Sequence, residues 1–192
     1  MPSLREARAA LTGLGKLLRF DAGFINWFDR GPAGALRAFG LMIPLLPVFL
    51  LWLFLQFDAS AELSALLIGA RIAIYYVLGW VMFPLILIVI GRAVERESQA
   101  IGAIGPYIWF SGALSLLVCL LSILGLIGPA GAVLDLLDWP IVIASLVYEA
   151  YLLQVLMGIG YLGAGILAVV DYTLGRSLFF LLIVPAIVLP TS

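Results

Sequence analysis

Five long apolar stretches, separated by short polar segments, dominate the pattern of this chain. Each is about 20 residues or longer, which is the length that a helix needs to cross the hydrocarbon core of a bilayer. The predicted membrane spans are residues 38–57, 63–91, 104–127, 139–157 and 162–189. The pattern therefore predicts the all-α class, with a polytopic bundle of five transmembrane helices in residues 35–192.

Residues 1–34 have a different pattern and are expected to form a cytoplasmic segment with an amphipathic, interfacial helix. Ser3 and Glu6 form an S-x-x-E capping box, which predicts the start of that helix. Its basic face carries Arg5, Arg8, Lys16 and Arg19. That face is expected to bind anionic lipid at the membrane surface. Packing of the apolar face against the bundle is an equally favoured alternative.

Breaks and connections follow from a few residues. Asp21 is placed to cap a second, short aromatic helix. Pro44 and Pro47 predict a kink in the first span, because each removes a backbone donor. The charged run Arg92–Glu97 is expected to extend the second helix into water, and the glycines of residues 158–165 predict a tight return before the last span.

Composition and charge set the environment and the orientation. The chain is 65% hydrophobic and 11% charged, with a mean hydropathy of +1.22, far from a soluble domain. Of the ten basic residues, eight lie before the first span or just after the second, so the positive-inside rule predicts a cytoplasmic N-terminus and a C-terminus outside. An integral protein of a bacterial inner membrane is the expected localisation.

The residues that are missing narrow the chemistry. Histidine is absent and Cys119 is the only cysteine, which argues against zinc catalysis, histidine-ligated haem and an intrachain disulfide. No P-loop, nucleophile elbow or dinucleotide-binding fingerprint is present. We therefore expect a protein that is not an enzyme, needs no cofactor or metal and does not bind nucleic acid.

Four charged residues lie inside the apolar spans and form a candidate intramembrane charge cluster. They are Arg71, Glu149, Asp171 and Arg176. Helix rise places Glu149 and Arg176 near mid-bilayer, so these two are expected to form the primary ion pair. A structural network that fixes helix register is the favoured interpretation. A proton or substrate pathway through Glu149 is the alternative.

Small residues form a stripe along the third span. They are Ser111, Ser115, Cys119, Ser122 and Gly125. Small residues at this spacing let helices approach closely in lipid, so a helix-packing seam is expected. A polar pathway is the alternative.

The architecture resembles that of the Yip1-like membrane proteins, most closely the bacterial branch. The shared features are the amphipathic N-terminal segment, five helices with short loops, and a glycine-rich turn before a last helix that carries an acidic residue. Fragments of the family's sequence motifs stand at Gly105–Tyr107 and Tyr172–Leu174. The resemblance implies a non-enzymatic protein of membrane organisation or trafficking that acts through helix contacts.

Two functions are therefore carried forward. The first is a structural or adaptor protein, an accessory subunit that binds other membrane proteins or itself. The second is a small oligomeric ion-coupled transporter or channel that uses the charge cluster. A dry, fully paired cluster favours the first, whereas a water-accessible, polar funnel that reaches an unpaired Glu149 carboxylate favours the second.

Overall fold

The computed structural model describes residues 2–56, 65–127 and 136–184, and every regular element in these ranges is a helix. Five helical stretches of this part are long and apolar enough to cross a membrane: Pro32–Leu55, Leu66–Ala93, Glu97–Leu126, Asp138–Met157 and Tyr161–Ile183. The predicted all-α class is confirmed for the described residues, and five helices of a length and apolarity suited to cross a membrane fit an integral membrane protein.

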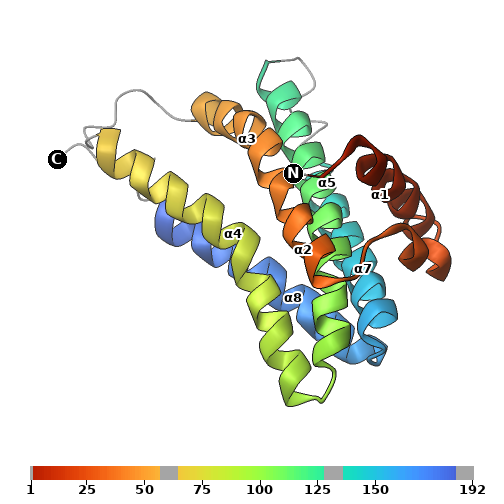
Figure 1. The fold of residues 1–192 in the computed structure, drawn as a ribbon. Coiled ribbons are helices and arrows are strands. Elements are labelled where there is room, and N and C mark those ends of the chain that lie inside the picture. Colours follow the sequence, from red (N-terminus) through yellow and green to blue (C-terminus); the bar gives the residue numbers. More distant parts are fainter. Residues whose placement is uncertain (1, 57–64, 128–135, 185–192) are drawn as a thin grey trace.

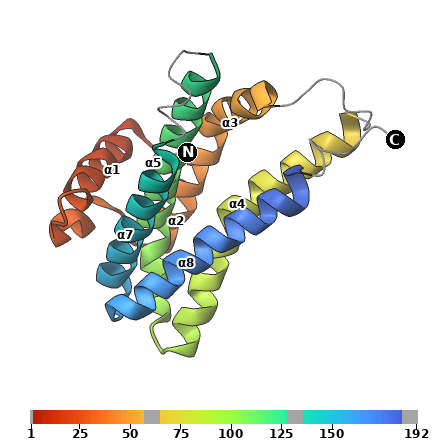
Figure 2. The same cartoon turned by 180° about the vertical axis from the view of Figure 1, so that it is seen from behind.

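The membrane domain has two arms (Figures 1 and 2). One arm holds α3 (Met42–Gln56), α5 (Glu97–Ile127) and α7 (Asp138–Met157). The other holds α4 (Ala65–Ala93) and α8 (Tyr161–Leu178), which continues as the π-helix η3 (Phe179–Ile183). The arms meet where α4 turns into α5 and α7 turns into α8, and they diverge toward the opposite end.

The N-terminal segment packs on the flank of the α5 and α7 arm. It contains α1 (Leu4–Leu17), with the predicted capping box at Ser3 and Glu6, and the short helix η1 (Ala22–Trp27), capped by Asp21 as predicted. Leu17 and Phe24 are fully buried against the bundle. The packing alternative is thus what the structure contains, while lipid binding by the outward basic side chains stays a prediction.

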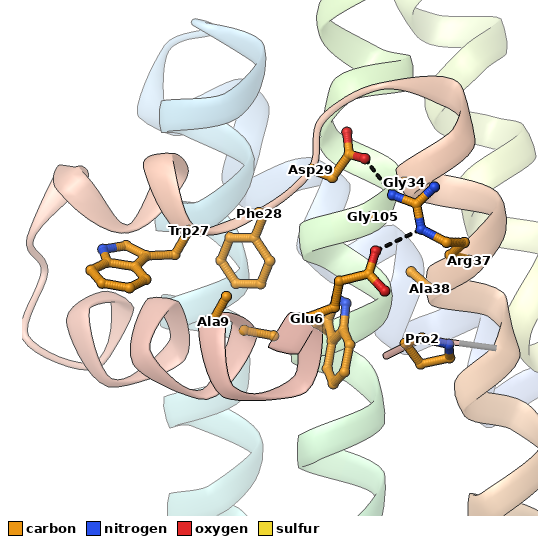
Figure 3. A pocket seen from close by; sticks show the side chains of 12 residues that line it. Pro2, Glu6, Ala9, Trp27, Phe28, Asp29, Gly34, Arg37, Ala38 and Gly105 are labelled. Carbon is orange, nitrogen blue, oxygen red and sulfur yellow. Dashed lines mark hydrogen bonds and ion pairs between the residues drawn. The ribbon is translucent and has the colours of Figure 1, made fainter. Parts of the chain in front are cut away.

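Arg37 ties this segment to the first span (Figure 3). Its guanidinium bonds the Glu6 carboxylate at 2.6 Å and the Asp29 carboxylate at 2.5 Å. The Ser3 backbone amide, and then Arg37, hold the pKa of Glu6 below its ordinary value. Gly34 is needed here, because a Cβ at that position would overlap the backbone and side chain of Asp29.

The first span begins earlier than predicted and is interrupted. It starts with α2 (Pro32–Ala38), because Pro32 is well suited to the first position of a helix. A 3-10 turn, η2 (Phe39–Leu41), then separates α2 from α3. Pro44 lies just beyond that turn and cannot donate to the carbonyl four residues back, which accounts for the local departure from α-geometry.

The expectation that Arg92–Glu97 extends the second helix is wrong. α4 ends at Ala93, Glu95 adopts a left-handed φ of 57°, and α5 begins at Glu97, seven residues before the predicted start of the third span. The Arg96 side chain does not extend α4. Its Nη1 donates to the backbone carbonyls of Met157 and Gly158 at 2.8 and 2.5 Å. These bonds cap the C-terminus of α7, so the charged run is a turn joined to the next helix pair.

Candidate functional site

A cavity of about 430 Å³ lies between the two arms. Its walls come from α3, α4, α5, α7 and α8, so it exists only because the arms diverge above their shared base. A volume of this order is typical of sites for small molecules.

Two carboxyl groups and a phenol meet at the base of this cavity. Glu149 of α7 is only 5% exposed, and its Oε1 has no hydrogen-bond partner among the described residues. Its side chain interacts with that of Asp171 on α8. The hydroxyl of Tyr107 on α5 donates to Asp171 Oδ2 at 2.7 Å. Among the described residues, one carboxyl oxygen of this pair is thus buried without a hydrogen-bond donor, which is uncommon for a buried polar atom.

The position of each group along its helix explains this meeting. Glu149 lies eight residues before the end of α7, and Asp171 lies ten residues after the start of α8. Both are thus about 12 to 15 Å from the turn that joins the two helices. Tyr107 lies ten residues after the start of α5, at the same end of the bundle. Three helices therefore bring these side chains to one level.

The predicted ion pair between Glu149 and Arg176 is wrong for the described residues, where no such pair forms. Arg176 lines the same cavity, but its guanidinium lies over the Phe180 ring, 5.1 Å from the centroid. It is about 22 Å from the start of α8, well above the level of Glu149. Arg71 does not line the cavity, and its Nη1 is buried without a partner among the described residues.

Aromatic rings form much of the remaining wall, and the sequence analysis did not identify them. They are Phe49, Trp52, Tyr75, Tyr76, Trp80, Tyr107, Tyr172 and Phe179. Phe49 joins the arms by packing on Tyr75 and Tyr76 of α4, with ring centroids 5.9 and 4.9 Å apart. Trp52 also carries an indole Nε1 that is buried without a partner among the described residues.

The predicted seam lies only partly in helix contacts. Ser111, Ser115 and Cys119 line the cavity, and Ser115 is exposed in this single chain, so both the packing seam and the polar pathway stay predictions for these positions. Extending the same spacing one turn toward the N-terminus of α5 reaches Tyr107. That was the signal in the sequence that could have identified the phenol.

The hydroxyl groups of Tyr148 and Tyr151, the tyrosines nearest to Glu149 in the sequence, bond the N-terminal segment and not Glu149. Tyr148 and Tyr151 donate their hydroxyls to the backbone carbonyls of Leu18 and Phe20, at 3.3 and 2.7 Å. Their rings pack on that of Phe20, with centroids 5.0 and 5.1 Å apart. One face of α7 thus anchors the N-terminal segment while the other presents Glu149 to the cavity.

Comparison with protein-family models, with curated proteins and with solved structures finds no match to this chain. The resemblance to the Yip1-like proteins therefore stays a prediction.

Proposed function

We propose that this protein is a small proton-coupled membrane carrier that binds a solute in the cavity between its arms. The observation that carries the proposal is the Glu149 carboxylate, buried in the cavity wall with one oxygen unpartnered among the described residues. Ionisable groups within a membrane domain are costly, and unpaired ones mark pathways more often than scaffolds. Two features expected of a transporter support this choice over the adaptor: a cavity that reaches Glu149 and a carboxyl oxygen without a partner among the described residues.

The pair of carboxyl groups supports the coupling to protons. Two ionised carboxylates side by side repel each other, so such a pair is suited to exchange one proton for a cation or for a change in conformation. Of the titratable and charged groups that line the cavity, Tyr107 contacts the pair, and the others are Tyr75, Tyr76, Cys119, Tyr172 and Arg176. Tyr107 holds Asp171 in position by its hydrogen bond, and Glu149 interacts with Asp171 but keeps its Oε1 without a partner among the described residues.

The architecture supports alternating access. The two arms are joined at one end by short turns and diverge at the other (Figure 2). Two ring contacts bridge the arms across the cavity: Phe49 with Tyr75, with centroids 5.9 Å apart, and Trp52 with Phe179, with centroids 6.3 Å apart. Rocking of the α4 and α8 arm against the rest would open or close these contacts. Carriers that work in this way bind their solute near the middle of the membrane.

The test is charge movement in proteoliposomes adsorbed on a solid-supported membrane. A pH jump should give a transient current, because the carboxyl pair takes up or releases protons within the membrane. Glu149→Gln and Asp171→Asn should each reduce this current about tenfold or more, since each removes one member of the pair.

The matched control is Asp138→Asn, which removes an exposed carboxylate at the start of the same helix, outside the cavity. It should leave the current unchanged. Equal currents from wild type and from a Glu149→Gln, Asp171→Asn double variant would overturn the proposal and return the adaptor hypothesis to first place.

A further inference from the structure

The chemistry of the cavity wall assigns a class of ligand, and this inference rests on the proposed function. We propose that the cavity binds a lipophilic organic cation, an amine or quaternary ammonium with an apolar body. The charged head would sit at Glu149 and the body among the aromatic rings above it.

The electrostatics of the base favour a cation. Glu149 and Asp171 place two carboxyl groups there, and the Glu149 oxygen has no donor among the described residues. Among the described residues that line the cavity, the positively charged side chain is that of Arg176, which is exposed and stacked on the Phe180 ring. A ligand cation at the base would therefore be drawn to the carboxyl groups with no competing cation at that level.

The aromatic rings above the base of the cavity also favour a cationic ligand. Trp52, Phe49 and Tyr76 present π-systems to the cavity, and tryptophan and tyrosine faces attract cations that have lost part of their water shell. The ring of Trp52 packs on Phe49 at 5.8 Å and on Phe179 at 6.3 Å, so the aromatic lining crosses from one arm to the other. An inorganic cation would leave this apolar surface unused, which favours an organic ligand.

The cavity is also elongated. It follows α5 from Tyr107 to Cys119, a rise of about 18 Å along the helix. A head group at Glu149 therefore leaves room for a body that reaches the level of Cys119. Because Cys119 is the only cysteine in the chain, it reports on whether that upper region is occupied.

The experiment uses the full-length protein in lipid nanodiscs and a pair of ions of matched shape, tetraphenylphosphonium and tetraphenylborate. The measured quantity is the rate at which Cys119 reacts with N-ethylmaleimide, a neutral reagent. The cation should slow this reaction about tenfold or more at saturation, because it fills the cavity below and beside the thiol. The anion should leave the rate unchanged at the same membrane-bound concentration.

Variants locate the effect at the carboxylate. Glu149→Gln should raise the concentration of tetraphenylphosphonium needed for half protection about tenfold or more, whereas Asp138→Asn should not change it. If Glu149→Gln does not fold, the comparison of the two ions on the wild-type protein still decides the sign of the ligand charge, and Phe49→Leu should weaken protection several-fold.

The outcomes separate this inference from the proposed function. Equal protection by both ions, or protection by the borate alone, would overturn the cation assignment, and an intact pH-jump current would then leave the carrier function standing. Unaltered protection in Glu149→Gln would likewise overturn it. If the wild-type protein shows neither the pH-jump current nor protection of Cys119 by tetraphenylphosphonium, both proposals are rejected.

Discussion

Replacement of Gly158 by alanine should destabilise the turn that aligns Glu149 with Asp171. Gly158 caps the C-terminus of α7 with a left-handed φ of 63°. An L-residue in that region costs about 1 to 2 kcal/mol. A Cβ there would also lie 2.7 Å from Nη1 of Arg96 and would push that guanidinium from its two carbonyl acceptors.

The magnitude follows from these two contributions. Charge-assisted hydrogen bonds contribute about 1.5 to 3 kcal/mol each when buried, but one of these two is exposed and the arginine can move, so we count about 1.5 kcal/mol for their weakening. Restriction of the unfolded chain by alanine offsets about 0.5 kcal/mol. We expect Gly158→Ala to lower the free energy of unfolding by about 2 to 3 kcal/mol.

The assay is equilibrium unfolding in mixed detergent micelles, with Gly160→Ala as the matched control. Gly160 has φ −66° and ψ 156°, which alanine adopts freely, and a Cβ there meets nothing within 4 Å. Gly160 is the N-cap of α8, where glycine is preferred to alanine, and this loss is offset by the restriction of the unfolded chain, so the net cost should stay below about 1 kcal/mol. In an Arg96→Met background, Gly158→Ala should cost only about 1 kcal/mol, the backbone part. Equal effects of the two glycine substitutions, or no coupling to Arg96, would refute the reasoning.

The remaining predictions concern the N-terminal segment, the charge cluster and the orientation. The pKa of Glu6 is lowered from its ordinary value of 4.5, so its contribution to stability is complete above about pH 4.5 and is lost as pH falls through the lower, folded-state pKa. Limited proteolysis of the segment should therefore be modestly faster in acid. Because the pair with Arg37 is part-exposed, Glu6→Gln should cost under about 1 kcal/mol and flatten this pH dependence. Since Glu149 and Arg176 form no ion pair among the described residues, the effects of Glu149→Gln and Arg176→Gln on the free energy of unfolding should be additive in the double variant. A coupling free energy of about 1 kcal/mol would instead show that the two side chains interact. A peptide of residues 1–30 should become helical on anionic vesicles and lose binding at high salt, and binding that ignores salt would exclude the electrostatic account. A reporter fused to the C-terminus should behave as external, and a cytoplasmic signal would invert the five-span orientation.

Local physics made much of the fold accessible from the sequence. Apolar stretches of membrane length predicted five spans, and five suitable helices are present in the described chain. The capping residues Ser3 and Asp21 each bond a backbone amide within a few positions of themselves, so their roles needed no knowledge of the rest of the structure. Both are consequences of the hydrophobic effect and of backbone hydrogen bonding along a short piece of chain.

Tertiary structure alone decided which side chains meet. In the sequence analysis, the depth of Glu149 was counted from one face of the membrane and that of Asp171 from the other face. Counted from the turn that joins α7 and α8, the two residues lie at nearly equal distances along their helices. Helix rise gives height but neither the direction in which a side chain points nor the tilt between helices. The divergence of the arms, which sets both, depends on packing between helices distant in sequence, and it turned the stripe at Ser111, Ser115 and Cys119 toward a cavity.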